Sequence, residues 1–159
     1  MQVKSRHHLR SDEVGRVRDA VEDVLGVRVE GDSFERVEFD SADTDLVLVD
    51  GEPLVAYFDD EPFLTVRGAN AFPPERNVVT VDAGAVSFVS DGADVMRPGI
   101  VDADESIAAG EMVVIVEETH GKALAVGRSR VDGEELAGDS GKVIDSVHHV
   151  GDELYQQTV

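Results

Sequence analysis

The sequence predicts a mixed α+β fold in two parts, a helix with an antiparallel meander followed by a small mixed β-barrel. Apolar residues recur at helical spacing near the start, and short β-rich runs separated by turn signals follow. A segment rich in Gly, Asn and Pro, residues 68–77, divides those runs into two groups. We therefore expect an α+β unit over residues 1–76 and a β-barrel unit over residues 77–159.

The first unit is expected to open with one amphipathic helix. Ser11 is the expected N-cap, Asp12 and Glu13 suit the positive end of the helix dipole, and apolar residues recur up to Gly26. The β-rich runs "ERVEFD", "DLVLVD", "PLVAYF" and "PFLTVR" follow, separated by turn formers that include Asp50-Gly51 and residues 59–62. An antiparallel meander packed on the helix is the simplest arrangement.

The second unit alternates strands with short helical turns. "VVTVD", "ADVMR", "EMVVIVEE", "KALAVGRSR" and "GKVIDSVHHV" are expected strands, with a hairpin turn at His120-Gly121. "AGAVSFVSDG" is expected to form a short helix that ends before Asp91-Gly92, and "VDGEELAG" a helical turn. Several short strands at regular spacing favour a barrel.

Acidic residues dominate the composition. The chain has 34 Asp and Glu against 14 Lys and Arg, for a net charge of −20, and its only lysines are Lys4, Lys122 and Lys142. This balance resembles that of proteins from extreme halophiles. In dilute buffer so many like charges repel one another and oppose a compact fold. At about 1 M salt the Debye length falls to roughly 3 Å, and this repulsion is largely screened. The 42% apolar content argues against disorder. The absence of cysteine excludes thiol chemistry, and with no apolar run long enough for a membrane span we expect a cytoplasmic protein.

Ordered blocks in the second half resemble a known family. "VVTVDAGAVSFVSDGADVMRPGIV", "GEMVVIVEE", "ALAVGRS" and "GKVIDSVHHVGDELY" resemble a PUA domain, the module named after pseudouridine synthases and archaeosine transglycosylases. The first half, with "VKSRHHLRSDEV" ahead of the helix, resembles the pre-PUA domain of archaeal relatives of the malignant T-cell-amplified-sequence proteins. That resemblance implies RNA binding and a role in translation, in ribosome recycling or reinitiation alongside tRNA and a translation-factor partner.

The resemblance also implies a site, because in PUA domains the short helix and the strand after it form a groove that accepts RNA. The site residues that the resemblance implies are Gly84, Ala85, Gly92, Met96, Arg97, Pro98 and Gly99, although each glycine taken alone more often only marks a turn of the barrel. Arg97 offers a planar fork of donors to a phosphate or a guanine edge, although it equally suits a solvated arginine or a pair with Asp94. Arg128 and Arg130, alternate residues of one strand, extend the predicted phosphate-facing surface, unless they are solvated strand ends.

The start of the chain is its one locally basic segment. Lys4, Arg6, His7 and Arg10 suit contacts to RNA phosphates, a first strand with solvated charges, or an acidic patch on a protein partner. Four of the five histidines form two adjacent pairs, and the rings of a pair that lies on a strand point to opposite faces, so their spacing predicts no metal site. No nucleophile elbow, P-loop or dinucleotide fingerprint occurs, and we expect neither an enzyme nor a bound cofactor.

Three functions remain open at this stage. The first is an RNA-binding translation protein, expected to be a monomer, that contacts tRNA or small-subunit ribosomal RNA. The second is a protein-interaction adaptor whose barrel is a scaffold, and the third is an accessory RNA-recognition subunit of an RNA-modification enzyme. An exposed apolar patch on the meander would favour the adaptor. A neutral or positive strip that joins Arg97 to Arg128 would favour RNA.

Overall fold

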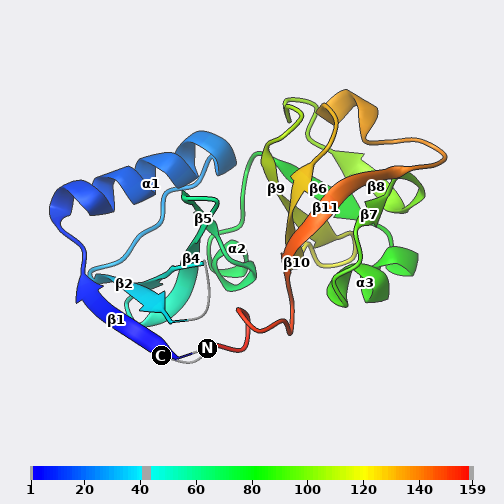
Figure 1. Cartoon of the computed structure of the whole chain (residues 1–159). Coiled ribbons are helices and arrows are strands. Elements are labelled where there is room, and N and C mark those ends of the chain that lie inside the picture. The colour runs from blue at the N-terminus through cyan, green and yellow to red at the C-terminus, as the bar shows by residue number, and fades with distance from the viewer. Residues whose placement is uncertain (1, 41–43, 158–159) are drawn as a thin grey trace. The chain divides into compact units, whose positions relative to one another are not determined.

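The computed structural model describes residues 2–40 and 44–157, which form two compact units (Figure 1). The division falls between Pro73 and Pro74, within the segment that is rich in Gly, Asn and Pro. The second unit extends to Gln156. Each unit has its own sheet, so the two are described separately.

The first unit is an antiparallel meander with two helices. Its five strands lie in chain order, β1-β2-β3-β4-β5, and α1 packs against β5 (Figure 1). Both α1 and the buried strand β3 supply the core, with Val17, Val21 and Leu25 pointing inward from the helix. The elements are β1 (Val3–His8), α1 (Ser11–Leu25), β2 (Phe34–Phe39), β3 (Leu46–Val49), β4 (Glu52–Phe58), β5 (Glu61–Leu64) and α2 (Val66–Ala71).

The start of α1 differs by one residue from the prediction. Ser11 is the first helical residue, and the N-cap is Arg10, whose backbone N–H donates to Glu13 Oε1 at 3.1 Å. Glu13 is the third helical residue, and its carboxylate accepts the backbone N–H of the N-cap residue. This hydrogen bond stabilises the start of the helix without a hydroxyl side chain at the N-cap. The helix ends as predicted at Gly26, which adopts φ 71° and donates its N–H to Glu22 O.

The prediction of a strand through Arg67 was wrong. Strand β5 ends at Leu64, and Thr65 caps α2 by accepting the Gly68 N–H at 3.0 Å. Gly68 is therefore part of a helix rather than of a linker. A Cβ at this position would lie 1.9 Å from Leu54 O, so only glycine lets α2 approach β4 this closely.

The second unit is a mixed barrel built on one six-stranded sheet. The strand order is β7-β11-β10-β9-β6-β8, with β6 and β9 parallel and the other pairs antiparallel. The two ends of this order, β7 and β8, follow each other in the chain, so the sheet curls into a nearly closed barrel (Figure 1). Its elements are β6 (Val78–Val81), α3 (Ala83–Ser90), β7 (Val95–Met96), η1 (Arg97–Gly99), β8 (Ile100–Ala103), β9 (Met112–Glu117), β10 (Ala123–Ser129), η2 (Gly133–Glu135) and β11 (Lys142–His149).

The barrel interior holds β-branched and leucine side chains from nearly every strand. The core includes Val81, Ile115 and Ile144, and it also takes Leu136, which follows η2 in the long loop between β10 and β11. Strand β8 was not predicted, because its four residues, "IVDA", carry too few apolar positions to show a period. Its pairing with β6 is what closes that edge of the barrel.

Candidate functional site

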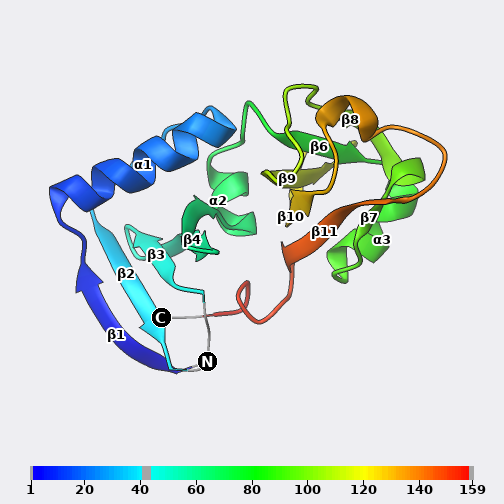
Figure 2. The same ribbon diagram turned by 45° about the horizontal axis from the view of Figure 1, so that its top comes forward.

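Helix α3 stands at one end of the barrel beside β7, where both views place it (Figures 1 and 2). Asp82 caps it by accepting the Ala85 N–H at 3.0 Å. The helix contains no charged residue, and Val89 is its only buried one. Its neighbour Phe88 is turned outward with 67% of its surface exposed, the most among the large apolar side chains of the described residues.

The segment after α3 forms the facing wall. Met96 is 48% exposed, whereas Val95 before it is buried. The wall approaches the helix closely at Gly99, where a Cβ would lie 2.9 Å from the Ala85 Cβ. Gly99 O also accepts the Asp82 N–H at 2.9 Å, so η1 and the start of α3 are tied together.

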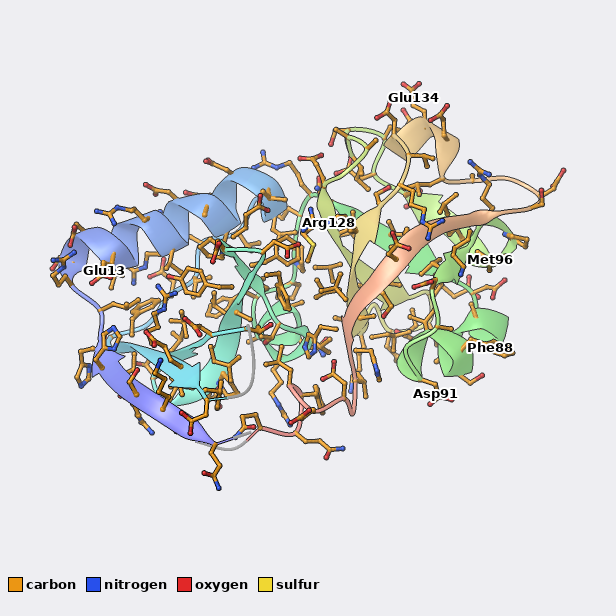
Figure 3. The ribbon with its side chains drawn as sticks, in the orientation of Figure 1. Glu13, Phe88, Asp91, Met96, Arg128 and Glu134 are labelled. Carbon is orange, nitrogen blue, oxygen red and sulfur yellow. The ribbon has the colours of Figure 1, made fainter. Side chains whose placement is uncertain are left out.

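Between these walls lies an open hollow of about 420 Å³. Five of the predicted site residues line it, namely Gly84, Ala85, Met96, Pro98 and Gly99. Phe88 lines it too and was missed by sequence reasoning, although its position next to the inward-facing Val89 on a helix already turned it toward solvent. Figure 3 shows Phe88 and Met96 on the same side of the barrel. We call this hollow the α3 groove.

The carboxylates at the groove are already engaged. Asp82 caps α3, and Asp94 accepts the Ser146 N–H at 2.7 Å and lies 3.2 Å from the Lys142 ammonium. The Ser146 hydrogen bond, helped by Lys142, outweighs burial and holds the pKa of Asp94 below its ordinary value. The groove therefore presents a mainly apolar surface, and both of its carboxylates accept hydrogen bonds from backbone N–H groups of the same unit.

Gly92 and Arg97 do not line the groove. Gly92 adopts φ 94°, and the His149 ring covers it, since a Cβ there would lie 2.7 Å from His149 Nε2. The Arg97 guanidinium bonds to the backbone of its own chain, with Nε donating to Glu135 O at 2.9 Å and Nη1 to Ser140 O at 3.0 Å. Asp94 forms its salt bridge with Lys142 rather than with Arg97.

The two arginines of the β10 region lie elsewhere on the barrel. Arg128 is on the side away from Phe88 and Met96 (Figure 3), and its Nη1 donates to Gly110 O at 2.7 Å. Arg130 forms a salt bridge with Asp145, and the hydrogen bonds that its guanidinium donates to that carboxylate raise the pKa of Arg130. The structure therefore brings neither residue to the α3 groove.

Most of the basic start of the chain lies in β1, one of the two edge strands of the first unit, and Arg10 is the N-cap of α1. Lys4 and His7 are exposed there. Arg6 forms a salt bridge with Glu35 of β2, and this hydrogen bond lowers the pKa of Glu35. Arg10 lies 3.2 Å from Glu13. These side chains are accessible, but acids of the same unit accompany Arg6 and Arg10.

The last histidine pair belongs to the fold of the barrel. His148 is buried, and its Nδ1–H donates to the Asp152 carboxylate at 2.9 Å. His149 Nδ1 lies 2.9 Å from Ser90 O, a carbonyl, so this nitrogen carries a proton and ties β11 to the end of α3. Within residues 2–40 and 44–157, no three His, Cys, Asp or Glu side chains are grouped to hold a metal. No helix in the same ranges is long and apolar enough to cross a membrane.

Similarity to known proteins now identifies the class. Residues 77–151 match the PUA domain family. A conserved PUA domain protein from Thermoplasma acidophilum superposes with a TM-score of 0.85 at 31% identity, over 96% of this chain and 98% of its own. The second unit is a PUA domain, as the sequence predicted.

The particular family follows from relatives that are similar beyond the PUA domain. An uncharacterized protein of Methanocaldococcus jannaschii is 36% identical over 159 residues, 98% of each chain. Translation machinery-associated protein 20 of Saccharomyces cerevisiae is 35% identical over 121 residues, 72% of this chain and 67% of its own. Malignant T-cell-amplified sequence 1 of Rattus norvegicus is also similar. The chain therefore belongs to the PUA-domain family that contains translation machinery-associated protein 20.

Proposed function

We propose that this protein binds RNA through the α3 groove and acts in translation, on tRNA or small-subunit ribosomal RNA. The observation that carries the proposal is the groove itself, a mainly apolar hollow in the PUA unit with Phe88 and Met96 exposed on its walls. An exposed aromatic ring accepts any unpaired base by stacking, which is worth about 1–3 kcal/mol per base. Such a surface suits a splayed-out base better than a phosphate.

The translation role is supported by the Saccharomyces cerevisiae relative, which is named as a translation machinery-associated protein. In this proposal the protein works in the cytoplasm at the small ribosomal subunit, in a step such as recycling or reinitiation, alongside a translation-factor partner. It recognises RNA and performs no catalysis. The RNA contacts the predicted residues that line the groove, namely Gly84, Ala85, Met96, Pro98 and Gly99.

The distribution of exposed apolar side chains favours RNA recognition over the adaptor function. Of the five large apolar side chains exposed within the described ranges, four belong to the PUA unit: Phe88, Met96, Val101 and Val147. Only Val3 belongs to the first unit. The meander therefore lacks, in its described part, the apolar patch that an adaptor would use.

Salt dependence provides the test. An RNA-binding protein that relies on phosphate contacts loses affinity steeply as salt rises, because counterion release drives its binding. A chain with a net charge of −20 that binds a base should instead be repelled from RNA at low salt. We expect binding of total tRNA to persist or strengthen as KCl rises from about 0.1 M to about 2 M, since screening removes the repulsion.

The measurement is fluorescence anisotropy with labelled total tRNA, with circular dichroism at each salt concentration to show that the protein stays folded. A steep, monotonic loss of binding by the folded protein would contradict recognition of a base. Crosslinking and sequencing of RNA from a high-salt lysate then separates tRNA from ribosomal RNA. Recovery of no RNA would favour the adaptor function.

A further inference from the structure

Arg97 turns away from the groove that its two neighbours line. Met96 and Pro98 both face the α3 groove, whereas Arg97 is half-buried and donates to Glu135 O and Ser140 O. A side chain between two groove residues is thus committed to another segment of the chain. That segment is the loop between η2 and β11, residues 136–141, which we call the acidic-side loop.

The acidic-side loop has little else to hold it. Leu136 at its start is buried in the barrel core, but residues 137–140 are exposed. Arg97 reaches both ends of the loop, because Nε bonds to Glu135 O, just before it, and Nη1 to Ser140 O, near its end. The Arg97 backbone N–H also donates to Gly141 O at 2.9 Å. A planar guanidinium can hold two carbonyls in this way, whereas a lysine ammonium is a point donor.

The loop sequence is fitted to the arginine. A Cβ at Gly138 would lie 2.9 Å from Arg97 Cδ, and a Cβ at Gly141 would lie 2.9 Å from Arg97 Nη1. Gly141 also adopts φ 102°, a conformation that other residues rarely take. Two glycines therefore leave space for one side chain, which indicates that the contact between Arg97 and the loop is a built feature of the fold.

The same arginine begins η1, the wall of the groove. Gly99, at the end of η1, packs so closely on Ala85 that no Cβ would fit between them, and its carbonyl accepts the Asp82 N–H. A shift of η1 by a few tenths of an ångström would therefore change the width of the groove at its narrowest contact. The position of η1 depends in turn on the hydrogen bonds that Arg97 makes to Glu135 O, Ser140 O and Gly141 O.

We propose that Arg97 is a positioning residue, which clamps the acidic-side loop and thereby sets the η1 wall of the groove, and that it does not contact RNA. The proposal rests on the proposed function of the α3 groove. It replaces the prediction that Arg97 contacts RNA directly, which would require its guanidinium to face the RNA. The two roles predict different effects on tRNA affinity when the salt concentration, the side chain at position 97 or the loop is changed.

The first test compares R97A and R97K in the full chain, with labelled total tRNA as the probe. Loss of the clamp should weaken tRNA binding about tenfold, the size expected for lost charge-assisted hydrogen bonds. R97K should resemble R97A, because lysine cannot span the two carbonyls. The slope of log affinity against log salt should match that of the wild type. Near-normal binding by R97K, or a slope changed by about 0.7 as for one lost phosphate contact, would overturn the proposal.

The second test disturbs the clamp from the loop. G141A removes no charge and lies outside the groove lining, yet its Cβ would displace Arg97 Nη1. We expect G141A to weaken tRNA binding as R97A does, and the double variant to bind no worse than either, because both break one unit. G121A is the matched control, since Gly121 has φ 70° but open space around it. Normal binding by G141A, or additive losses, would overturn the proposal.

A third measurement needs no RNA and separates failure of this inference from failure of the proposed function. Amide hydrogen exchange of the wild type, R97K and G141A reports local opening. The Asp82 and Ile100 amides, whose hydrogen bonds end on Gly99 O and Arg97 O, should exchange about tenfold faster in both variants. The Val114 amide of β9 should stay protected, which excludes general destabilisation. Equal acceleration at all three, or none, overturns the role of Arg97 even if the wild type binds no RNA.

Discussion

Helices α1 and α3 present opposite surfaces to solvent. The exposed positions of α1 are all polar and most of them are charged, among them Arg16 and Asp12, which form a salt bridge along the helix. The exposed positions of α3 carry no charge and include Phe88. In a chain that is 30% charged, an uncharged exposed helix departs strongly from the average surface. The contrast locates the surface that a ligand is expected to cover.

The two helices are also held differently. α1 buries three apolar residues against its sheet, whereas α3 buries Val89 alone. Polar contacts at the ends of α3 compensate, with the Asp82 cap at one end and the bond from His149 to Ser90 O at the other. An apolar side chain that faces a ligand cannot also fill the core, so anchors at the helix ends take over that role.

The largest expected effect is on RNA binding by F88A. Removal of one stacking ring should cost about 1–3 kcal/mol, or roughly fivefold to 150-fold in affinity for total tRNA. Because Phe88 is 67% exposed, the free energy of unfolding should change by no more than about 0.5 kcal/mol. Anisotropy and denaturant melts measure the two quantities.

V3A is the matched control for F88A, since Val3 is an exposed apolar residue of the first unit. It should leave tRNA affinity unchanged. Equal losses in F88A and V3A would show that the contrast between the two helices does not mark the binding surface.

A smaller effect is expected on stability from D152N, which loosens the anchor behind α3. The Asp152 carboxylate accepts from His148 Nδ1 and from the His149 and Tyr155 N–H groups. Burial acts to raise the pKa of Asp152, but these hydrogen bonds outweigh it and hold the pKa below its ordinary value. D152N should lower the free energy of unfolding at neutral pH by about 1–2 kcal/mol.

The pH dependence of this difference has a definite sign. A carboxylate with a lowered folded-state pKa stabilises the fold fully above its ordinary value of about 3.9, and this contribution is lost as the pH falls through the lowered pKa. The gap between the wild type and D152N should therefore be constant near neutrality and narrow in acid. Urea melts at several pH values measure it, and a gap that widens in acid would refute the assignment.

Much of the fold could be predicted because its signals are local. The period of α1, the turn at Asp50-Gly51 and the hairpin at Gly121 are each encoded within a few residues. Strand β8 and helix α2 were missed for the opposite reason. "IVDA" becomes a strand only by pairing with β6, and Gly68 is helical because α2 must approach the Leu54 backbone.

The lining of the α3 groove could be predicted in part for the same reason. Residues next to each other in sequence, such as Pro98 and Gly99, came to the groove together. What Arg97 contacts could not be predicted, because its acceptors lie about forty positions away and are backbone carbonyls, which any residue carries. Phe88 could have been found from the helical phase of Val89 alone.

The smallest effect is expected from R16A on α1. Arg16 lies 2.9 Å from Asp12 one turn away, and both side chains are mostly exposed. Such a pair contributes about 0.2–0.5 kcal/mol, and less as salt screens it. R16A should therefore change the free energy of unfolding by no more than that amount and leave tRNA binding intact, as denaturant melts and anisotropy can show. A tenfold loss of tRNA affinity in R16A would instead place the RNA on the charged helix α1. If α1 only contacts solvent, its charges do not affect the affinity for RNA bound at α3.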